Sequence, residues 1–481
     1  MISLLVLALA GAPVDTIDNV PSVLHPTDGG LTAERVAARA QLDAPDVELR
    51  AAELEVAAAR VDQARAQYVP ALDLSAQYMR LSPLPGGTSG ALTGTLNPGP
   101  LTVGACPDGT TGCVVDSQGV PAVSQTFQFS SIQDTYALAA VVGVPISDYL
   151  FTIPHAVNAA KHGEKAAVLA RDIERIDTAV DAQIAFYNWV RAQANLELAE
   201  RSAVRIGERI DEAQIRQRAG LITQTDVLRL QAQLAAAERS VAEAEAFVAI
   251  TAEDLGARTA LDPMELSLGE DVTAAFASDR KRGPTKVLVD AAMTRRLEVA
   301  LLRESDATLR EQIAVARTQY APRLDLVGRV DTANPNQRVV PQEDQFNTTW
   351  AAGVRLSYDV RAAVGTRAKV RTQRAQRRAV NAQIAQLQRG IRMQVVRAAN
   401  DLGAARRAVD LDRVALQSAE AAYDQVSARY QAGAVGVIDL MEAESLRVEA
   451  ELRSLESHIA VREQDLRLRH AMGEIDPPSA S

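Results

Sequence analysis

Four segments of the chain alternate apolar and polar residues with the two-residue period of a β-strand. They cover about 70–80, 125–147, 322–332 and 345–358. In the last of them, one set of alternate residues is mostly apolar or aromatic and comprises Phe346, Thr348, Trp350, Ala352, Val354, Leu356 and Tyr358. Because side chains on a strand point alternately to opposite faces, each predicted strand has one apolar face and one polar, partly charged face.

Long stretches between the strands have the spacing of helices. No proline interrupts the chain from about Pro154 to Arg218, which predicts a helix roughly 95 Å long. Apolar residues recur at heptad intervals in the helices that follow, at Val227, Leu230, Leu234, Val241, Val248 and Leu255, and later at Val448, Leu452, Leu455 and Ile459. We expect two antiparallel coiled-coil hairpins with tips at 220–226 and 433–439. Such helices fit a tunnel wall and a coiled-coil scaffold equally well.

The order of strands and helices occurs twice. A Tyr-x-Pro-x-Leu-x-Leu motif at 68–74 recurs at 320–326. At each hairpin tip a glycine precedes an aspartate by six residues, and these residues are Gly220 with Asp226 and Gly433 with Asp439. Two ordered sets of matching landmarks predict an internal repeat.

A third landmark aligns Gly143 with Gly353. From this landmark to the tip glycine, the two copies have almost the same length. Between the motif proline and the landmark, however, the stretch that begins at Pro70 is more than twice as long as the stretch that begins at Pro322. We assign the excess to a loop insertion in the Gly-, Pro-, Thr- and Ser-rich segment at about 82–124.

These landmarks divide the chain into two copies, each with the order helix, strand, strand, long helix, long helix. Copy one is expected at 31–258 and copy two at 287–473. The linker between them, at 259–286, contains prolines and glycines. A linker at 11–30 precedes copy one, and a tail at 474–481 follows copy two. The predicted fold is therefore mixed α and β, and mostly α.

The N-terminal residues form an apolar run. Ala8, Leu9 and Ala10 fit the small-x-small pattern of a signal peptidase site, although no Lys or Arg precedes the run. The alternative is a disordered or helical N-terminus in a cytosolic protein. We predict a signal peptide at about 1–10.

No other segment contains the run of about 18 apolar residues that a transmembrane helix needs. If the chain enters a membrane, it must do so as a barrel, because open backbone cannot face lipid. Strands of ten residues or more have the length of outer-membrane strands, although an ordinary soluble sheet also alternates. Four strands would leave two open edges. Three copies would supply twelve strands around a water-filled lumen that the charged face lines.

The composition excludes several functions. The formal net charge is −10 and the pI about 5.3, so nothing indicates a nucleic-acid partner, which requires a basic face. The five histidines are scattered, and no phosphate-binding loop, nucleophile elbow or zinc motif stands out. We therefore predict no enzymatic activity, no cofactor and no resident metal ion.

The two cysteines, Cys106 and Cys113, flank a short segment of the predicted loop. In an oxidising compartment they could close it as a disulfide. A two-cysteine metal site is the alternative, but no histidine lies near them. We favour the disulfide.

Over nearly its whole length after the predicted signal, the sequence resembles the TolC family of outer-membrane efflux proteins. The resemblance rests on the doubled strand motif and the doubled hairpin tips. It implies a homotrimer whose twelve-stranded β-barrel lies in outer-membrane lipid and joins an α-helical barrel that crosses the periplasm. It further implies a passive exit duct that works with a periplasmic adaptor and an inner-membrane pump or ABC transporter.

The resemblance also implies roles for residues at the tips. Acidic residues of the copy-two tip ring the entrance in the family, and the matching positions are Asp439 and Glu442, three residues apart on one helix face. A helix-start acid favoured by the helix dipole is the alternative explanation of Asp439. Asp226 is interpreted chiefly as a helix cap. Family members can latch the entrance through a basic residue just after the copy-two glycine, and Ala434 and Val435 here put that latch in doubt.

The adaptor-docking surface that the resemblance implies comprises Gly220, Asp226, Gly433 and Asp439. The rival interpretation is a protein of another class, a periplasmic coiled-coil scaffold or adaptor without a pore. Within the channel interpretation, small toxic molecules such as drugs and metals compete with secreted proteins as the exported substrate.

Overall fold

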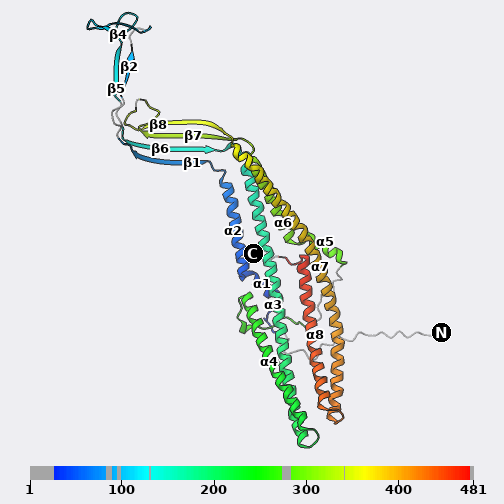
Figure 1. The fold of residues 1–481 in the computed structure, drawn as a ribbon. Coiled ribbons are helices and arrows are strands. Elements are labelled where there is room, and N and C mark those ends of the chain that lie inside the picture. Colours follow the sequence, from blue (N-terminus) through cyan, green and yellow to red (C-terminus); the bar gives the residue numbers. More distant parts are fainter. Residues whose placement is uncertain are drawn as a thin grey trace, which may run out of the picture. The chain divides into compact units, whose positions relative to one another are not determined.

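The computed structural model describes residues 26–82, 89–94, 99–128, 132–272, 283–340 and 342–476. The described part is mostly helical, with one four-stranded sheet and two small two-stranded sheets (Figure 1). The predicted signal peptide at 1–10 lies outside it. Contacts group the chain into two compact units, one made of Met1–Val61, Ala159–Arg310 and Gln373–Ser481, the other of Asp62–Asn158 and Glu311–Thr372.

The elements of the two copies follow the same order. Those of copy one are α1 (Ala33–Asp43), α2 (Pro45–Ala66), β1 (Ala71–Arg80), β6 (Asp134–Val144), α3 (Ile153–Arg218) and α4 (Gln224–Thr259). Those of copy two are α5 (Thr285–Arg295), α6 (Leu297–Thr318), β7 (Arg323–Asn334), β8 (Asn347–Ser357), α7 (Val360–Gln431) and α8 (Val437–Met472). The long helix predicted from about Pro154 to Arg218 is confirmed as α3.

The predicted loop at 82–124 contains strands of its own. They form two ladders, β2 (Ser89–Gly94) with β5 (Val123–Gln128) and β3 (Thr102–Ala105) with β4 (Thr111–Val115). The segment 125–147, which alternation predicts as one strand, therefore belongs partly to β5 and partly to β6. β6 ends just before Pro145, which has no N–H to donate to a ladder.

The four long strands form one antiparallel sheet in the order β1-β6-β7-β8. In this order β6 and β7 each have a neighbour on both sides. β1 and β8 each have one neighbour among the described strands, so the sheet ends in two unpaired edges within one chain.

Strand pairing corrects the alignment of the two copies. Ala71 begins β1 and pairs with Gly143, whereas Arg323, which begins β7, pairs with Ser357. Gly143 therefore corresponds to Ser357 and not to Gly353, so the insertion in copy one is four residues shorter than the sequence landmarks predict. A slip of four residues leaves every side chain on the same face, because the period of a strand is two. Alternation alone therefore could not reveal the slip.

The helices of the two copies match in length. α2 and α6 each contain 22 residues, and α4 and α8 each contain 36. The start of α4 at Gln224 thus corresponds to the start of α8 at Val437. Between the matched positions Gly143 and Ser357 and these helix starts, copy one contains one residue more than copy two. A π-helical turn at Asp148–Thr152 precedes α3 and can accommodate this additional residue.

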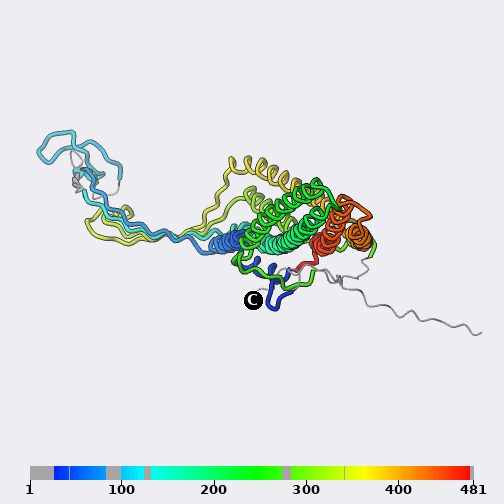
Figure 2. The backbone as a smooth tube through the Cα atoms, turned by 90° about the horizontal axis from the view of Figure 1, so that it is seen from below, coloured from blue at the N-terminus to red at the C-terminus, as the bar shows by residue number. Residues whose placement is uncertain are grey.

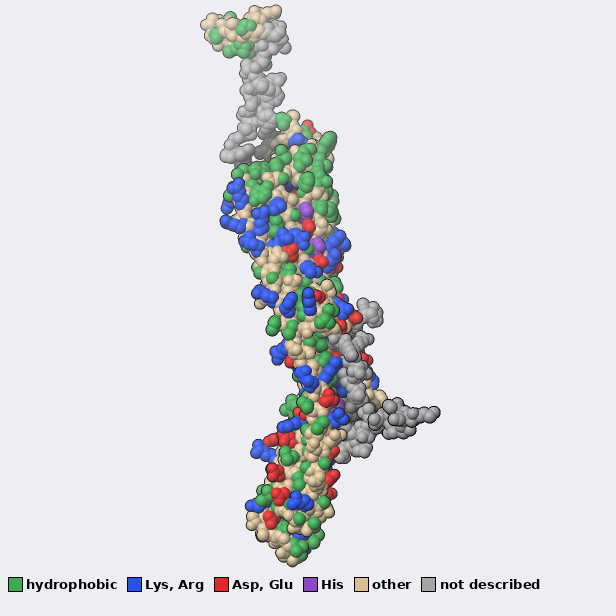
Figure 3. Space-filling model, turned by 90° about the vertical axis from the view of Figure 1, so that its right-hand side faces the viewer, with side chains coloured by type: hydrophobic (Ala, Val, Ile, Leu, Met, Phe, Trp, Pro, Cys, Tyr) green, Lys and Arg blue, Asp and Glu red, His purple; other side chains and the backbone are tan. Residues whose placement is uncertain are grey.

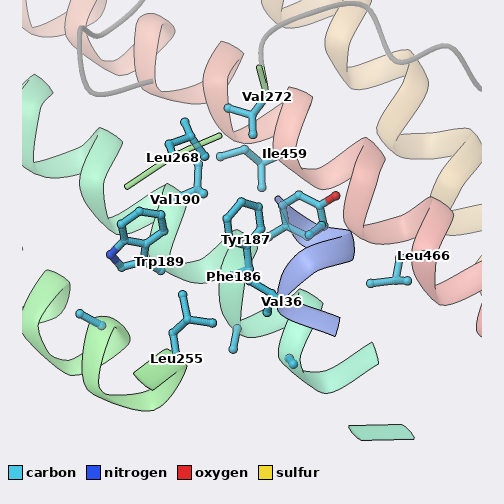
Figure 4. Close-up of a cluster of buried hydrophobic side chains, with 14 of the residues drawn as sticks. Val36, Phe186, Tyr187, Trp189, Val190, Leu255, Leu268, Val272, Ile459 and Leu466 are labelled. Carbon is cyan, nitrogen blue, oxygen red and sulfur yellow. The ribbon is translucent and has the colours of Figure 1, made fainter. Parts of the chain in front are cut away.

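The hydrophobic core of the helical unit is divided into separate clusters. One surrounds the fully buried Phe186 and joins α1, α3, α4, α8 and the linker residues Leu268 and Val272 (Figure 4). Another packs the two hairpins, α3–α4 and α7–α8, against each other near their tips. Figures 1 and 2 show these hairpins side by side. Packing between them thus holds both tips in one place.

Candidate functional site

The four-stranded sheet has one continuous apolar face. The pairing places Leu74 opposite Ala140, Ala140 opposite Val330 and Val330 opposite Trp350, so the apolar sets of all four strands coincide. The large exposed side chains on this face are Leu72, Leu74, Leu138, Val142, Leu326, Val330, Trp350, Val354 and Leu356. Trp350 is 73% exposed. Monomeric soluble proteins rarely expose an apolar patch of this extent, which marks it as an interaction surface.

Aromatic side chains lie at both ends of this sheet. At one end the ring of Tyr136 lies 5.0 Å from that of Tyr78 and 6.0 Å from that of Phe346. At the other end, where the helices begin, the rings of Tyr68 and Tyr149 lie 5.9 Å apart. Aromatic girdles at both ends of an apolar band are typical of strands that span an outer membrane.

The opposite face of the sheet is polar and carries ion pairs. Arg323 Nε lies 2.9 Å from Asp325, and Arg329 pairs with Asp331 two residues further along β7. Strand pairing places Arg355 of β8 opposite Asp325 on the same face. A charged face of this kind suits contact with water and not with lipid.

The two cysteines lie at the small β3–β4 ladder, Cys106 directly after β3 and Cys113 within β4. Cys106 and Cys113 form a disulfide, with 5.1 Å between their Cα atoms. Cys106 also donates its backbone N–H to Thr110, which closes the turn between the strands. Among the described residues, no group of three or more His, Cys, Asp or Glu side chains is arranged to hold a metal ion.

The tips of the two hairpins have the same backbone structure. Gly220 and Gly433 adopt positive φ angles of 74° and 71°, which favour glycine. In each tip the following residue donates its N–H back to the last turn of the long helix, from Leu221 to Arg216 and from Ala434 to Arg429. The glycines are therefore explained by the turn itself, and the docking role that the resemblance implies for them stays a prediction.

The aspartates of the tips occupy the same helical position. In α4, Asp226 accepts hydrogen bonds from the backbone and hydroxyl of Thr223, and Thr223 in turn accepts one from the N–H of Asp226. In α8, Asp439 accepts a hydrogen bond of 3.0 Å from the N–H of Gly436. Both carboxylates thus cap a helix start. Glu442 lies exposed almost one turn after Asp439, so the structure places the two predicted entrance residues together on the first turns of α8.

Contacts between the hairpins were not anticipated from the sequence. Arg209 of α3 donates to the Tyr423 hydroxyl at 3.1 Å, and the guanidinium of Arg216 lies 4.6 Å from the ring centre of Tyr430. Arg205 makes a 2.6 Å ion pair with the buried Glu444 of α8. The sequence signal for these contacts is the heptad spacing: Arg209 and Arg216 are seven residues apart, and so are Tyr423 and Tyr430. These contacts tie copy one to copy two just above the tips.

The pKa of Asp226 predicts that its cap weakens in acid. Hydrogen bonds from the Thr223 side chain, and then from its backbone, lower this pKa below the ordinary aspartate value. A lowered pKa stabilises the folded tip above the unfolded-state value, about 3.9, and this stabilisation is lost as the pH falls through the folded value. We expect Asp226→Asn to remove that dependence and to cost about 1 kcal/mol or less, because the Asn oxygen can still accept a capping hydrogen bond.

Hydrogen exchange of the amides around 221–228, corrected for intrinsic rates, measures the effect. Wild-type protection should fall on acidification through the carboxylate range, whereas that of the variant should not change. Replacement of the exposed Asp211 of α3 by Asn is the control. Equal acid sensitivity of wild type and Asp226→Asn would contradict the capping role.

None of the described helices combines the length and the hydropathy needed to cross a membrane.

The model of the family described as "Outer membrane efflux protein" matches residues 36–259 and 288–474. The outer membrane protein TolC of Vibrio cholerae is 23% identical over 268 residues, an alignment that covers 54% of this chain and 59% of that protein. The chain thus spans somewhat more than half the length of this curated relative.

Solved structures share the fold. The outer-membrane channel OprN gives a TM-score of 0.71 at 17% identity, over 96% of this chain and 97% of that one. The CmeC outer membrane channel of Campylobacter jejuni gives 0.71 at 15% identity, over 93% and 87%. The outer membrane protein VceC of Vibrio cholerae gives 0.70 at 16% identity, over 92% and 96%. Because the family model covers both copies of the repeat, this chain belongs to the outer membrane efflux protein family.

Proposed function

We propose that this chain is one protomer of a homotrimeric outer-membrane channel, the passive exit duct of a tripartite export system. The observation that carries the proposal is the sheet with an apolar, aromatic-bordered face and two unpaired edges. Three such sheets supply twelve strands, which remove the edges and turn the apolar face towards lipid. A periplasmic scaffold without a pore would leave this face in water, so it is the weaker explanation.

The helical hairpins form the periplasmic part of the duct in this proposal. Their tips provide the surface on which a periplasmic adaptor docks, and an inner-membrane pump or ABC transporter supplies the energy. Drugs, metal ions and secreted proteins are the candidate substrates. The contacts between Arg209 and Tyr423 and between Arg216 and Tyr430 support this role, because they hold the two tips of one protomer together as a single docking surface.

The copy-two tip supplies the selectivity of the entrance. Asp439 and Glu442 are both exposed on the first turns of α8. Three protomers would place six carboxylates around the axis, and a ring of this kind attracts cations and repels anions. The capping bond to Gly436 is compatible with this role, since it orients the Asp439 carboxylate without neutralising it.

Reconstitution in planar bilayers tests the channel and its entrance. We expect the purified trimer to conduct ions with a preference for cations, measured as a reversal potential in a salt gradient. Asp439→Asn with Glu442→Gln should reduce the cation-to-anion permeability ratio several-fold, and Asn retains an oxygen that can still cap α8. Asp226→Asn, the same change at the copy-one tip, is the matched control.

The two parts of the proposal fail in different ways. A trimer that conducts with unchanged selectivity in the double variant would overturn the acidic ring and leave the channel intact. A strictly monomeric protein that forms no pore in any bilayer would overturn the channel itself.

A further inference from the structure

The free edges of the sheet indicate which helices meet between protomers. Closing the barrel requires β8 of one copy to pair with β1 of the next, because these are the two edge strands. α2 leads into β1, and α7 begins three residues after the end of β8. In a trimer, α2 of one protomer therefore lies beside α7 of its neighbour, and the two run antiparallel. This step rests on the proposed trimer.

α2 carries an exposed strip on the side away from its buried face, and all of its residues except one glutamine are apolar. The strip, called the α2 strip below, consists of Leu49, Ala52, Val56, Ala59 and Gln63. The spacing alternates between three and four residues, as in a helix that packs along a partner. Leu49 and Val56 are 56% and 52% exposed, so the part of the chain that the structure describes leaves about half of each of these side chains uncovered.

α7 carries a matching strip of small residues. The α7 strip consists of Gly365, Ala368, Thr372, Ala375, Ala379 and Ala382, all of them exposed. Small side chains on one helix leave room for Leu and Val on the other and allow close approach of the two backbones. The two strips therefore complement each other in size.

Opposite charges line one border of the two strips, the border that precedes the strip residues. Along α2 the residues that come directly before strip positions include Glu48, Glu55 and Asp62, and along α7 they include Arg367, Arg371, Arg374 and Arg378. α7 contains no Asp or Glu from Val360 to Asn400. Figure 3 views the molecule from the side on which α7 lies and shows Lys and Arg side chains gathered in its upper part. When two helices pack antiparallel, the residues directly before the strip positions of one helix face the corresponding residues of the other. The acidic residues of α2 would therefore lie beside the arginines of α7.

The chain already contains one copy of this helix pair. α6 and α3 are the repeat counterparts of α2 and α7, and they meet within the chain. His155 Nδ1 lies 2.6 Å from Glu311, and His162 Nδ1 lies 2.6 Å from Glu304. These two contacts therefore show which positions face each other when such a pair forms.

The repeat converts these contacts into positions on α2 and α7. When α6 and α2 are aligned on their first residues, Glu311 and Glu304 correspond to Ala59 and Ala52. When α3 and α7 are aligned on the tip glycines that follow them, His155 and His162 correspond to Ala368 and Ala375. All four alanines belong to the two strips, which were defined by exposure, side-chain size and helical spacing without reference to the repeat. The repeat thus predicts both the faces that meet and their register.

The levels of the charged residues, counted from the ends of the two edge strands, also match closely. The number of residues from Asp62 to the start of β1 is almost the same as the number from the end of β8 to Arg367. The number of residues from Glu55 to the start of β1 likewise almost equals the number from the end of β8 to Arg374. In each pair the two counts differ by one residue, which is about 1.5 Å along a helix. Asp62 also lies 3.4 Å from Arg65 of its own helix, but it is 75% exposed and free to approach a second arginine.

We infer that neighbouring protomers join along an α2–α7 seam, with Ala59 opposite Ala368 and Ala52 opposite Ala375. Glu48, Glu55 and Asp62 of one protomer form ion pairs with the arginines of the next along its border. The equivalent seam inside each protomer has His–Glu pairs at the positions where the α2–α7 seam has Ala opposite Ala. The partner of both strips is a second copy of this chain.

Cysteine cross-linking of the full-length protein in its native membrane tests the register. Ala59→Cys with Ala368→Cys, and Ala52→Cys with Ala375→Cys, should give disulfide-linked dimers and trimers under mild oxidation, because Ala–Ala positions bring Cβ atoms close enough. Ala59→Cys with Ala375→Cys is the matched control, since it is staggered by seven residues, or about 10 Å. The native cysteines are already paired with each other.

Charge reversal tests the border. Glu48→Arg with Glu55→Arg should lower the temperature at which the trimer dissociates in detergent, and so should Arg374→Glu with Arg378→Glu. The combined variant should recover most of the loss. Arg389→Glu with Arg392→Glu, also exposed on α7, is the matched control and should behave as wild type.

A trimer that forms normally but cross-links no better in the matched pairs than in the staggered pair would overturn the seam. Absence of any trimer would instead count against the proposed function.

Discussion

Replacement of Ala140 by arginine should prevent assembly of the protein in the outer membrane, whereas the same replacement at Ala139 should be tolerated. Ala140 lies in β6 between Leu74 and Val330, at the centre of the apolar face. An arginine there would face lipid, which costs about 2–4 kcal/mol near the middle of a bilayer. In a trimer the cost is incurred three times, enough to disfavour insertion of the whole barrel.

Ala139 provides the matched control. It lies in the same strand, one residue away, but on the opposite face, between Ser75 and Asp331. An arginine at that position would enter the water-filled lumen beside a carboxylate. The measurement is the amount of heat-modifiable trimer in isolated outer membranes, compared with total protein. Equal loss in both variants would show that the two faces do not differ in environment.

Much of the fold could be predicted because its signals are local and repeated. Alternation in the strands and heptads in the helices follow from which faces are buried, and the mostly helical class with long amphipathic strands is confirmed. The doubled motifs strengthen the prediction of each strand and helix, since the same element is predicted independently in both copies. The family resemblance is confirmed by a match that covers both copies.

The parts that could not be predicted depend on register or on distant partners. The slip between Gly143 and Gly353 is invisible to alternation because it is an even number of residues. The separation of β5 from β6 depends on pairing with β2, which carries too weak a signal to read from the sequence. The contact of Arg209 with Tyr423 joins residues that are far apart in the chain. Heptad spacing indicates that each faces a partner helix, but not which one.

The site shows a similar limit. Asp226 and Asp439 were found through the repeat, and the structure places both at a helix start with a backbone N–H bonded to the carboxylate. Position in a repeat therefore identifies an architectural role that both copies share. Of the two acidic residues of the copy-two tip, Glu442 is the one without an acidic counterpart, since copy one has Arg229 at that position, three residues after Asp226. The copy-two tip therefore has two neighbouring carboxylates, Asp439 and Glu442, where the copy-one tip has one carboxylate and one arginine.

The second large effect is expected at the core of the helical unit, where Phe186→Ala should strongly destabilise the protein. Phe186 is fully buried in α3, with the rings of Tyr187 and Trp189 at 5.5 and 6.1 Å (Figure 4). Removal of a buried phenyl ring leaves a cavity and costs about 3–5 kcal/mol. Leu255 of α4 and Ile459 of α8 belong to the same cluster, so the cavity would loosen several helices at once.

Phe247→Ala is the control, because this phenylalanine of α4 is 44% exposed and should lose much less on truncation. Thermal unfolding of the helical signal in detergent, at matched protein concentration, measures both variants. Phe186→Leu should recover a large part of the loss, since it refills most of the cavity. If Phe186→Ala unfolded at the same temperature as Phe247→Ala, the stability of the helical unit would have to come from contacts between protomers. Variants along the α2–α7 seam should then lower the unfolding temperature more than Phe186→Ala does.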